Sequence, residues 1–393
     1  MRPVLVLILH PTAPASAGPL VRALAEARGA LAERQRAAFV AAGADAAEVM
    51  AGPPDGLSFG ERLRGAIVAA RPGTTSGTSG TSGTPGAPGD LGASEPGGLV
   101  VLGSGSIPLA MAADLRRFVD VAAGPGGHAL ANNLYSADVV AISRPADLAA
   151  LPLLPADNAH PRWLAERAGV AVTDLRSRWR LGVDVDTPLD LIVLRDPAAS
   201  GLLAAAPLIG ERLAALAEVL SNRRAELLLA GRVSATTLKW LERSVACRVR
   251  ALVEERGLRA ASWLAQAGAT TGSRPPRSVL GELLDRDGPD ALAHAVARLA
   301  DAAVIDSRVL MAHEAGAADV AASRSQGAGW PPPEDRFASD LLLHDAVADP
   351  WLHALTASAA KAPSDHPILL GGHTMVNGGL RLLAQRARAG AAR

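Results

Sequence analysis

A short run of apolar residues, followed directly by a long stretch with helical periodicity, restricts the fold more than any other feature. Val4–Leu9 contains only valine, leucine and isoleucine, which is typical of a strand buried on both faces of a parallel sheet. Residues 19–43 repeat apolar side chains at three- and four-residue spacing and predict a helix. Residues 99–102 and 137–142 predict further strands. This alternation favours an α/β fold with functional loops at the carboxyl ends of the strands.

The length of the chain allows more than one domain. It has 393 residues, of which 49% are hydrophobic, so roughly two or three domains can each bury a core. We predict an N-terminal α/β domain over residues 1–198 and an α-rich domain over residues 199–393. Residues 72–98 consist mainly of glycine, serine, threonine and proline, and we expect them to form a flexible surface insertion.

The second half of the sequence is dominated by helical patterns. Residues 202–221, 234–257 and 278–313 predict helices. Residues 227–229 predict a short strand, and residues 367–374 predict a strand that enters a glycine-rich turn. These patterns support the α-rich interpretation of this half.

Charge and cysteine content exclude several classes of protein. Basic and acidic residues both number 39, and a net charge of zero argues against a nucleic-acid binder. The single cysteine, Cys247, excludes an internal disulfide framework and a cysteine-rich metal cluster. The apolar run near the N-terminus is too short to span a membrane. We therefore expect a cytoplasmic protein with no membrane partner; nothing in the pattern indicates an oligomeric state.

The segment Asp184-Val-Asp-Thr-Pro-Leu-Asp190 carries the strongest chemical signal. It predicts a strand end that runs into a helix, with Asp186 or Thr187 as the N-cap and Pro188 in the first turn. A cap at Asp186 would leave Asp184 at the edge of the strand, where its oxygens suit Mg²⁺ on a nucleotide phosphate. Alternatively, the three acidic residues only cap and solvate the helix.

The loop Gly103-Ser-Gly-Ser-Ile-Pro108 lies between a predicted strand and a predicted helix. Backbone N–H groups in this position can bind a phosphate, and the glycine spacing partly matches a dinucleotide-binding loop. A plain turn with Pro108 at the first helical position is the alternative.

These two segments, together with Leu57-Ser-Phe-Gly-Glu-Arg-Leu63, resemble the nucleotide-diphospho-sugar transferase superfamily, also known as the GT-A-like fold. The pattern is most similar to its small nucleotidyltransferases, such as the molybdenum-cofactor and 2-phospholactate guanylyltransferases. The resemblance covers about residues 1–198. It implies a three-layer α/β/α sandwich that binds a nucleotide or nucleotide-sugar with Mg²⁺ and transfers a nucleotidyl or glycosyl group to a small-molecule acceptor.

The resemblance also assigns roles to individual residues. Ser104, Gly105 and Ser106 would face the nucleotide, and Asp184 and Asp186 would contact the metal. The family has its metal aspartate where this chain has Gly105, and the loop after the first strand has no lysine. The alternative is therefore a catalytically decayed protein that binds nucleotides or serves as a scaffold.

Two further groups of polar residues are candidates. An acceptor side would be formed by Asn132, Asn133, Tyr135, Asp157, Asn158 and Arg162, although polar turns at strand ends have the same composition. In the second half, Asp340 and His344 are four residues apart and would share a helix face. They could form a metal or acid–base cluster, or a surface ion pair. His373 follows two glycines, in a turn that could approach a ligand or be purely structural.

Overall fold

A computed structural model of the chain describes residues 2–53, 57, 59–63, 97–143, 160–258, 274–317 and 329–391. Most of the predicted insertion at residues 72–98 lies outside the described residues, and its last residue, Gly98, begins a strand. The chain divides into two compact units. The first comprises Met1–His10, Ala32–Ser104 and Ala110–Leu175, and the second comprises Pro11–Leu31, Gly105–Leu109 and Arg176–Arg393.

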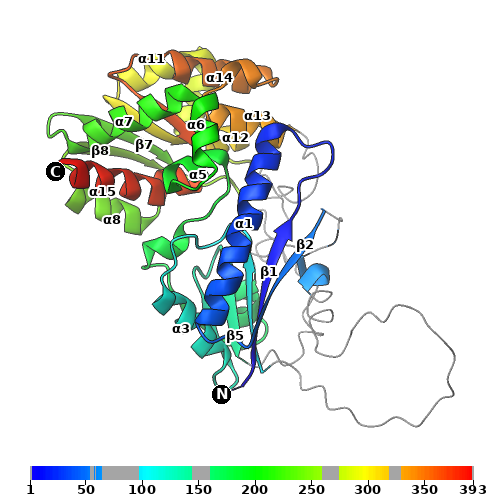
Figure 1. Ribbon diagram of the computed structural model, residues 1–393. Coiled ribbons are helices and arrows are strands. Elements are labelled where there is room, and N and C mark those ends of the chain that lie inside the picture. The colour runs from blue at the N-terminus through cyan, green and yellow to red at the C-terminus, as the bar shows by residue number, and fades with distance from the viewer. Residues whose placement is uncertain are drawn as a thin grey trace, which may run out of the picture. The chain divides into compact units, whose positions relative to one another are not determined.

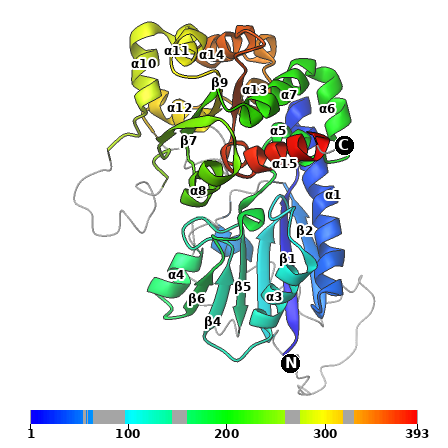
Figure 2. The ribbon, with the colours of Figure 1, turned by 90° about the vertical axis from the view of Figure 1, so that its left-hand side faces the viewer.

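Unit 1 contains a six-stranded sheet in the order β2-β1-β3-β5-β4-β6 (Figure 2). β1 pairs in parallel with β3, and β4 with β6, whereas β5 is antiparallel to both of its neighbours. The strands are β1 (Val4–Pro11), β2 (Ala46–Gly52), β3 (Gly98–Gly103), β4 (His128–Ala131), β5 (Val139–Ser143) and β6 (Ala171–Asp174). The predicted strands at 4–9, 99–102 and 137–142 are thereby confirmed within about two residues at their ends.

The described helices that accompany this sheet include α1 (Pro19–Ala41), whose second half from Ala32 belongs to unit 1, α3 (Ala112–Ala122) and α4 (His160–Glu166). Residues 59–63 are also helical. α3 packs on β3, β4 and β5 and buries Phe118 completely. The predicted helix at 19–43 is confirmed as α1.

Unit 2 contains a parallel sheet of four strands in the order β10-β9-β7-β8. Figure 1 labels β7 and β8 of this sheet. The strands are β7 (Glu226–Gly231), β8 (Arg248–Val253), β9 (Ala302–Asp306) and β10 (Ile368–Gly371). The α-helices are α5 (Pro188–Leu194), α6 (Ala199–Ala205), α7 (Pro207–Ser221), α8 (Ala235–Ser244), α10 (Val279–Asp287), α11 (Leu292–Ala297), α12 (Ser307–Glu314), α13 (Pro333–Asp340), α14 (Pro350–Lys361) and α15 (Leu380–Ala391). Short 3₁₀ turns are η3 (Trp179–Gly182), η4 (Pro289–Ala291) and η5 (His344–Ala346), and η6 (Met375–Gly379) is a π-helical turn.

The strand order of unit 2 contains a reversal. The chain steps from β7 outward to β8 and then back across β7 to β9, so β7 and β9 are neighbours. Right-handed crossovers in opposite directions place helices on both faces of the sheet. The point of reversal, outside the carboxyl ends of β7 and β9, is where open α/β sheets bind ligands.

The mixed α/β class is confirmed, and two local predictions are wrong. Residues 248–253, predicted as helix, form β8, and residues 302–306, inside the predicted helix at 278–313, form β9. The predicted boundary between residues 198 and 199 falls inside unit 2. Leu189 and Val193 of α5 explain this, because both are fully buried in the same hydrophobic cluster as the strands of unit 2.

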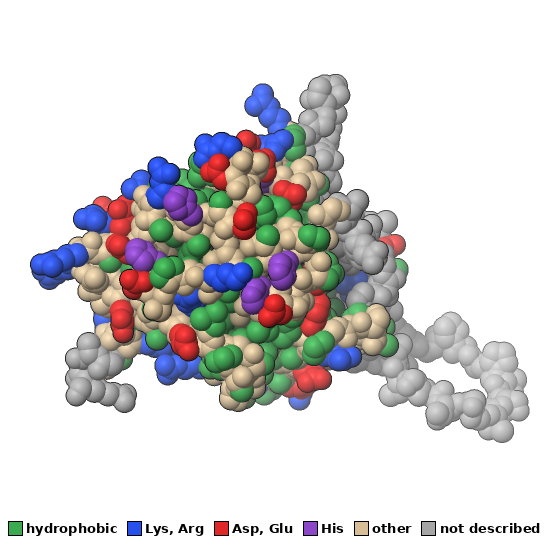
Figure 3. Space-filling model, turned by 90° about the horizontal axis from the view of Figure 1, so that it is seen from above, with side chains coloured by type: hydrophobic (Ala, Val, Ile, Leu, Met, Phe, Trp, Pro, Cys, Tyr) green, Lys and Arg blue, Asp and Glu red, His purple; other side chains and the backbone are tan. Residues whose placement is uncertain are grey.

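No described helix is long and apolar enough to cross a membrane. The face of the molecule in Figure 3 mixes acidic, basic and hydrophobic side chains, in keeping with the equal numbers of acidic and basic residues in the sequence.

Gly231, at the end of β7, is a position where only glycine fits. Its φ is +120°, and an added Cβ would lie 2.3 Å from the Cβ of Asp306. We expect Gly231→Ala to lower the free energy of unfolding by roughly 2 kcal/mol, because both the backbone and its neighbour would be strained.

Urea unfolding of this variant can be compared with that of Gly201→Ala. Gly201 lies in α6 with nothing within 4 Å of an added Cβ, so alanine there should be neutral or stabilising. Equal stabilities of the two variants would contradict the close approach of Gly231 to Asp306.

Candidate functional site

The two predicted metal residues, Asp184 and Asp186, flank the buried residue Val185. Val185 donates its backbone N–H to the carbonyl oxygen of Gly105 at 2.8 Å, and Ser106 forms an isolated antiparallel bridge with Asp184. Two of the three predicted nucleotide-loop residues therefore lie directly beside the predicted metal residues, and all four belong to unit 2.

The position of Gly105 explains why no carboxylate stands there. An added Cβ would lie 2.7 Å from the carbonyl oxygen of Val185 and 2.9 Å from Nε of Arg28. Arg28, on α1, donates this Nε to Val185 O and donates Nη2 to Oδ1 of Asp186 at 2.7 Å. Arg28 and the backbone of Val185 thus occupy the space in which the resembled family would have its aspartate.

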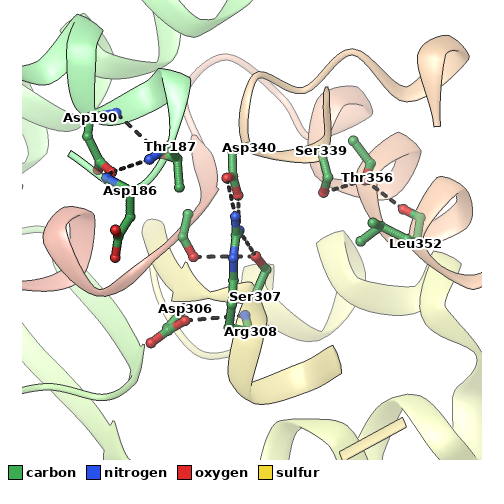
Figure 4. A network of polar contacts seen from close by, with 11 residues as sticks. Asp186, Thr187, Asp190, Asp306, Ser307, Arg308, Ser339, Asp340, Leu352 and Thr356 are labelled. Carbon is green, nitrogen blue, oxygen red and sulfur yellow. Dashed lines mark hydrogen bonds and ion pairs between the residues drawn. The ribbon is translucent and has the colours of Figure 1, made fainter. Parts of the chain in front are cut away.

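The start of α5 follows the sequence prediction. Thr187 is the N-cap and Pro188 occupies the first turn. Asp190 completes a capping box, because its Oδ2 accepts hydrogen bonds from the backbone N–H groups of Asp186 at 3.0 Å and Thr187 at 2.8 Å. Asp186 therefore does not cap the helix with its own carboxylate (Figure 4).

The carboxylates of Asp184 and Asp186 are close enough to act on each other. The side chain of Thr374, after β10, donates a hydrogen bond to Asp184 Oδ1, and the Thr374 Oγ1 also lies 3.2 Å from the backbone nitrogen of Asp184. Desolvation by the surrounding groups raises the pKa of Asp186, although its side chain is 56% exposed; the charge of Arg28 and a side-chain hydrogen bond with Asp184 outweigh this effect, and the net shift is downward. A pair of adjacent carboxylates thus lies within reach of the carboxyl end of β10.

Charged residues also follow β7 and β9 at the reversal of the sheet. Arg232 donates Nε to Oδ2 of Asp306 at 2.6 Å, and the Asp306 side chain is fully buried. Asp306 also caps α12 by accepting the backbone N–H of Arg308. Burial raises the pKa of Asp306, but Arg232 and then Arg256 outweigh this effect and lower it. Asp306 is therefore a buried anion paired with an arginine that is one-fifth exposed.

His373 lies in the same group of charges. Burial and the nearby positive charge of Arg232 lower the pKa of His373 to about 4, so its imidazole is neutral at pH 7. Asp186 and Asp306 also act on this ring, which places the ends of β7, β9 and β10 and the Asp184 segment in one polar cluster.

The π-helical turn η6 directly after His373 holds this cluster together. Its Asn377 accepts hydrogen bonds from Ser234 N and Thr237 Oγ1, both at 2.9 Å, and donates to the carbonyl oxygens of Arg232 and His373. π-Helical turns are rare and are frequent at functional sites.

No protein-family model matches the chain, and searches of curated proteins and of solved structures found no similar protein. The function is therefore inferred from the chemistry of the site itself.

The other predicted nucleotide and acceptor residues belong to unit 1. Ser104 is buried, and its hydroxyl lies 3.0 Å from Nδ1 of His10. Asn132 is buried and exchanges hydrogen bonds with Asp138, while Asn133 accepts the backbone N–H of Tyr135. These contacts are those of a turn that closes between β4 and β5.

Tyr135 and Arg162 lie against each other, with the guanidinium carbon 5.7 Å from the ring centroid. Arg162 also pairs with Glu166 on α4 at 2.9 Å. The remaining acceptor candidates, Asp157 and Asn158, lie outside the described residues.

Asp340 and His344 do not form the predicted cluster. α13 ends at Asp340, and the chain then turns through Leu342 with a φ of +57°, so the two residues do not share a helix face. Asp340 is fully buried and pairs with Arg308. His344 instead stacks on His353, with 5.7 Å between ring centroids. Of the three candidates in the second half, His373 alone lies in the polar cluster that contains Asp186, Arg232 and Asp306.

Among the described residues, Glu282, Asp285 and His313 have ligand atoms close enough to hold a metal ion. The hydrogen bonds of His313 do not fit that role. Its Nδ1 accepts the backbone N–H of Ser278 at 3.0 Å, so the proton of the neutral ring resides on Nε2, which faces Asp285 at 2.9 Å. A protonated Nε2 has no lone pair for a metal.

The residues of the polar cluster that were not predicted include Arg28, Arg232, Asp306 and Thr374. The signal that could have found three of them is their position, because each ends an apolar run or follows it within a few residues. Arg28 gave no such signal, since it lies in the middle of α1 among other arginines.

Proposed function

We propose that the chain is a nucleotide-dependent transferase that binds nucleotide phosphates with Mg²⁺ at Asp184 and Asp186. It would transfer a nucleotidyl or glycosyl group to a small-molecule acceptor. The observation that carries the proposal is the adjacent pair of carboxylates beside the Gly105–Ser106 loop, within one group of charges that includes Arg232 and Arg256.

The carboxylate oxygens of this site suit a hard cation such as Mg²⁺. Mg²⁺ in proteins is held by one or two carboxylates together with substrate phosphates and water, and Asp184 and Asp186 supply two. When bound, the ion would neutralise charge on phosphate oxygens. Within the chain, Arg232 would attract the same oxygens, because its Nε alone is used for Asp306.

His373 supplies a neutral imidazole in this setting. Nucleotidyl transfer forms a bond between an acceptor oxygen and the α-phosphorus, releases pyrophosphate and requires a group that takes the acceptor's proton. An anionic phosphate would offset the charge of Arg232, which helps to lower the pKa of His373, and would make the ring a stronger base.

A second candidate function is nucleotide binding without catalysis. It is favoured by the way Arg28 and Thr374 already occupy oxygens of Asp186 and Asp184. In this case Arg28 offsets the charge of Asp186 without a metal. The protein would then serve as a scaffold that responds to nucleotide binding.

Calorimetric titrations with adenosine and guanosine triphosphates and with a nucleotide sugar, each with and without Mg²⁺, test the proposal. We expect at least one ligand to bind more tightly with Mg²⁺, and Asp184→Asn to weaken that binding by about tenfold. The exposed carboxylate of Asp287 on α10 provides the control, and Asp287→Asn should leave the affinity unchanged.

The outcome separates the two candidate functions. Binding that is insensitive to Mg²⁺ and to Asp184→Asn would favour the non-catalytic scaffold. No binding of any of these ligands at millimolar concentration would refute both.

A further inference from the structure

A hollow in unit 2, lined by none of the residues proposed to bind the nucleotide or the metal, has no part in the proposed function. It has a volume of about 490 Å³ and lies among α5, α6, α7 and α15. Its walls are mainly aliphatic and include Ile192, Leu203, Leu213, Ala217 and Leu383. A hollow of this size and composition can accommodate the apolar part of a small molecule.

Two arginines line the same hollow, Arg195 and Arg386. Arg386 is fixed in place because its Nη2 donates to the carbonyl oxygen of Val193. Burial, followed by the positive charge of Arg195, lowers the pKa of Arg386, in keeping with the position of both arginines on the wall of one hollow.

Within the described residues, neither arginine forms an ion pair with a carboxylate. Asp196 also lines the hollow, but its Oδ1 accepts the backbone N–H of Ala198 just before α6. The hollow therefore combines apolar walls with an excess of positive charge.

We propose that this hollow binds an amphipathic carboxylate, with its aliphatic chain against the leucines and its carboxylate between Arg195 and Arg386. Carboxylates pair with guanidinium groups through charge-assisted hydrogen bonds. Such a ligand would relieve the repulsion between the two arginines and cover the exposed apolar walls.

Decanoate, kept below its micelle concentration, is a suitable probe for calorimetric titration of the full chain. We expect it to bind saturably, and its Kd to rise about three- to tenfold in Arg195→Gln. Arg195 is exposed, so the variant should fold. The matched control is Arg388→Gln, an exposed arginine of α15 that does not line the hollow, and its Kd should equal that of the wild type.

Two further ligand and variant measurements distinguish binding in this hollow from nonspecific adsorption of an apolar chain. Decanol has the same chain but no charge, so it should bind more weakly than decanoate and be insensitive to Arg195→Gln. Ala217→Phe, which fills the hollow from α7, should abolish decanoate binding. The proposal is overturned if the wild type does not bind decanoate, if both arginine variants weaken it equally, or if folded Ala217→Phe binds it unchanged.

Discussion

Asp340→Ala is expected to lower the free energy of unfolding by about 3–5 kcal/mol, because it leaves a buried arginine without its partner. The Arg308 side chain is 7% exposed and that of Asp340 is fully buried. The two form a bidentate pair, in which Nη1 and Nη2 of Arg308 donate to the two oxygens of Asp340 (Figure 4). Removing the carboxylate leaves a largely desolvated charge without its counter-ion.

Arg308 cannot escape this loss of stability by giving up its proton. Burial lowers the pKa of Arg308, but the charge of Asp340 opposes this and the net shift is upward, so the guanidinium stays charged. Its Nη1 also donates to Ser307 Oγ at 2.9 Å, and Ser307 donates in turn to the carbonyl oxygen of Gly371 at 3.3 Å. The pair thus connects α13 to the carboxyl ends of β9 and β10.

Urea unfolding measures this effect, and two further variants interpret it. The double variant Arg308→Met/Asp340→Leu should recover much of the lost stability, because a buried ion pair can be replaced by apolar side chains of similar volume. The exposed pair Arg286–Asp287 is the control, and Asp287→Ala should leave stability nearly unchanged. A small effect of Asp340→Ala would mean that Arg308 reaches water and is not buried as described.

The sequence was sufficient to predict those helices and strands whose own residues form a clear apolar or capping pattern. Val4–Leu9 is uniformly apolar and forms β1, and Thr187 with Pro188 and Asp190 starts α5 through a local capping box. β8 and β9 were not predicted, because their own residues show no pattern that identifies a strand. Arg248-Val-Arg-Ala-Leu-Val253 is an edge strand with no buried residue and with two arginines, so it lacks an apolar pattern. Ala302–Asp306 is too short to be distinguished from the helices around it.

The same distinction applies to the candidate site. Asp184 and Asp186 lie in one local motif, so their proximity could be predicted from spacing. Arg28 contacts Asp186 across 158 residues, and Arg232 contacts Asp306 across 74. Such pairs are created by the tertiary arrangement of unit 2, and no local pattern records which elements become neighbours.

Asp190 gives the second large effect, a loss of stability as pH rises. Burial, followed by the negative charge of Asp186, raises the pKa of Asp190 to about 7, whereas its ordinary value is 3.8. Its Oδ1 is buried and, within the described part of the chain, has no hydrogen-bond partner. The folded protein therefore favours the protonated form of this carboxyl group.

The sign of the pH dependence follows from this difference in proton binding. Below about pH 4 both the folded and the unfolded chain hold the proton. Between about pH 4 and 7 the unfolded chain loses it first, so the contribution of Asp190 to stability falls by about 4 kcal/mol across this range and stays constant above it. This trend is opposite to that of a salt-bridged carboxylate, which stabilises the fold more as pH rises.

Chemical denaturation of the wild type and Asp190→Asn at about pH 4 to 8 isolates this contribution. An amide does not titrate in this range, so the stability of the wild type minus that of the variant should decrease as pH rises. Thr187→Ala weakens the same capping box without removing a titratable group. Because the Thr187 hydroxyl helps to lower the pKa of Asp190, this variant should lower stability and keep a fall in stability with rising pH that is at least as large as that of the wild type. Parallel pH profiles for the wild type and Asp190→Asn would show that Asp190 is already ionised in the folded protein. The carboxylate would then add its charge to those of Asp184 and Asp186, and the cluster would attract a divalent cation more strongly.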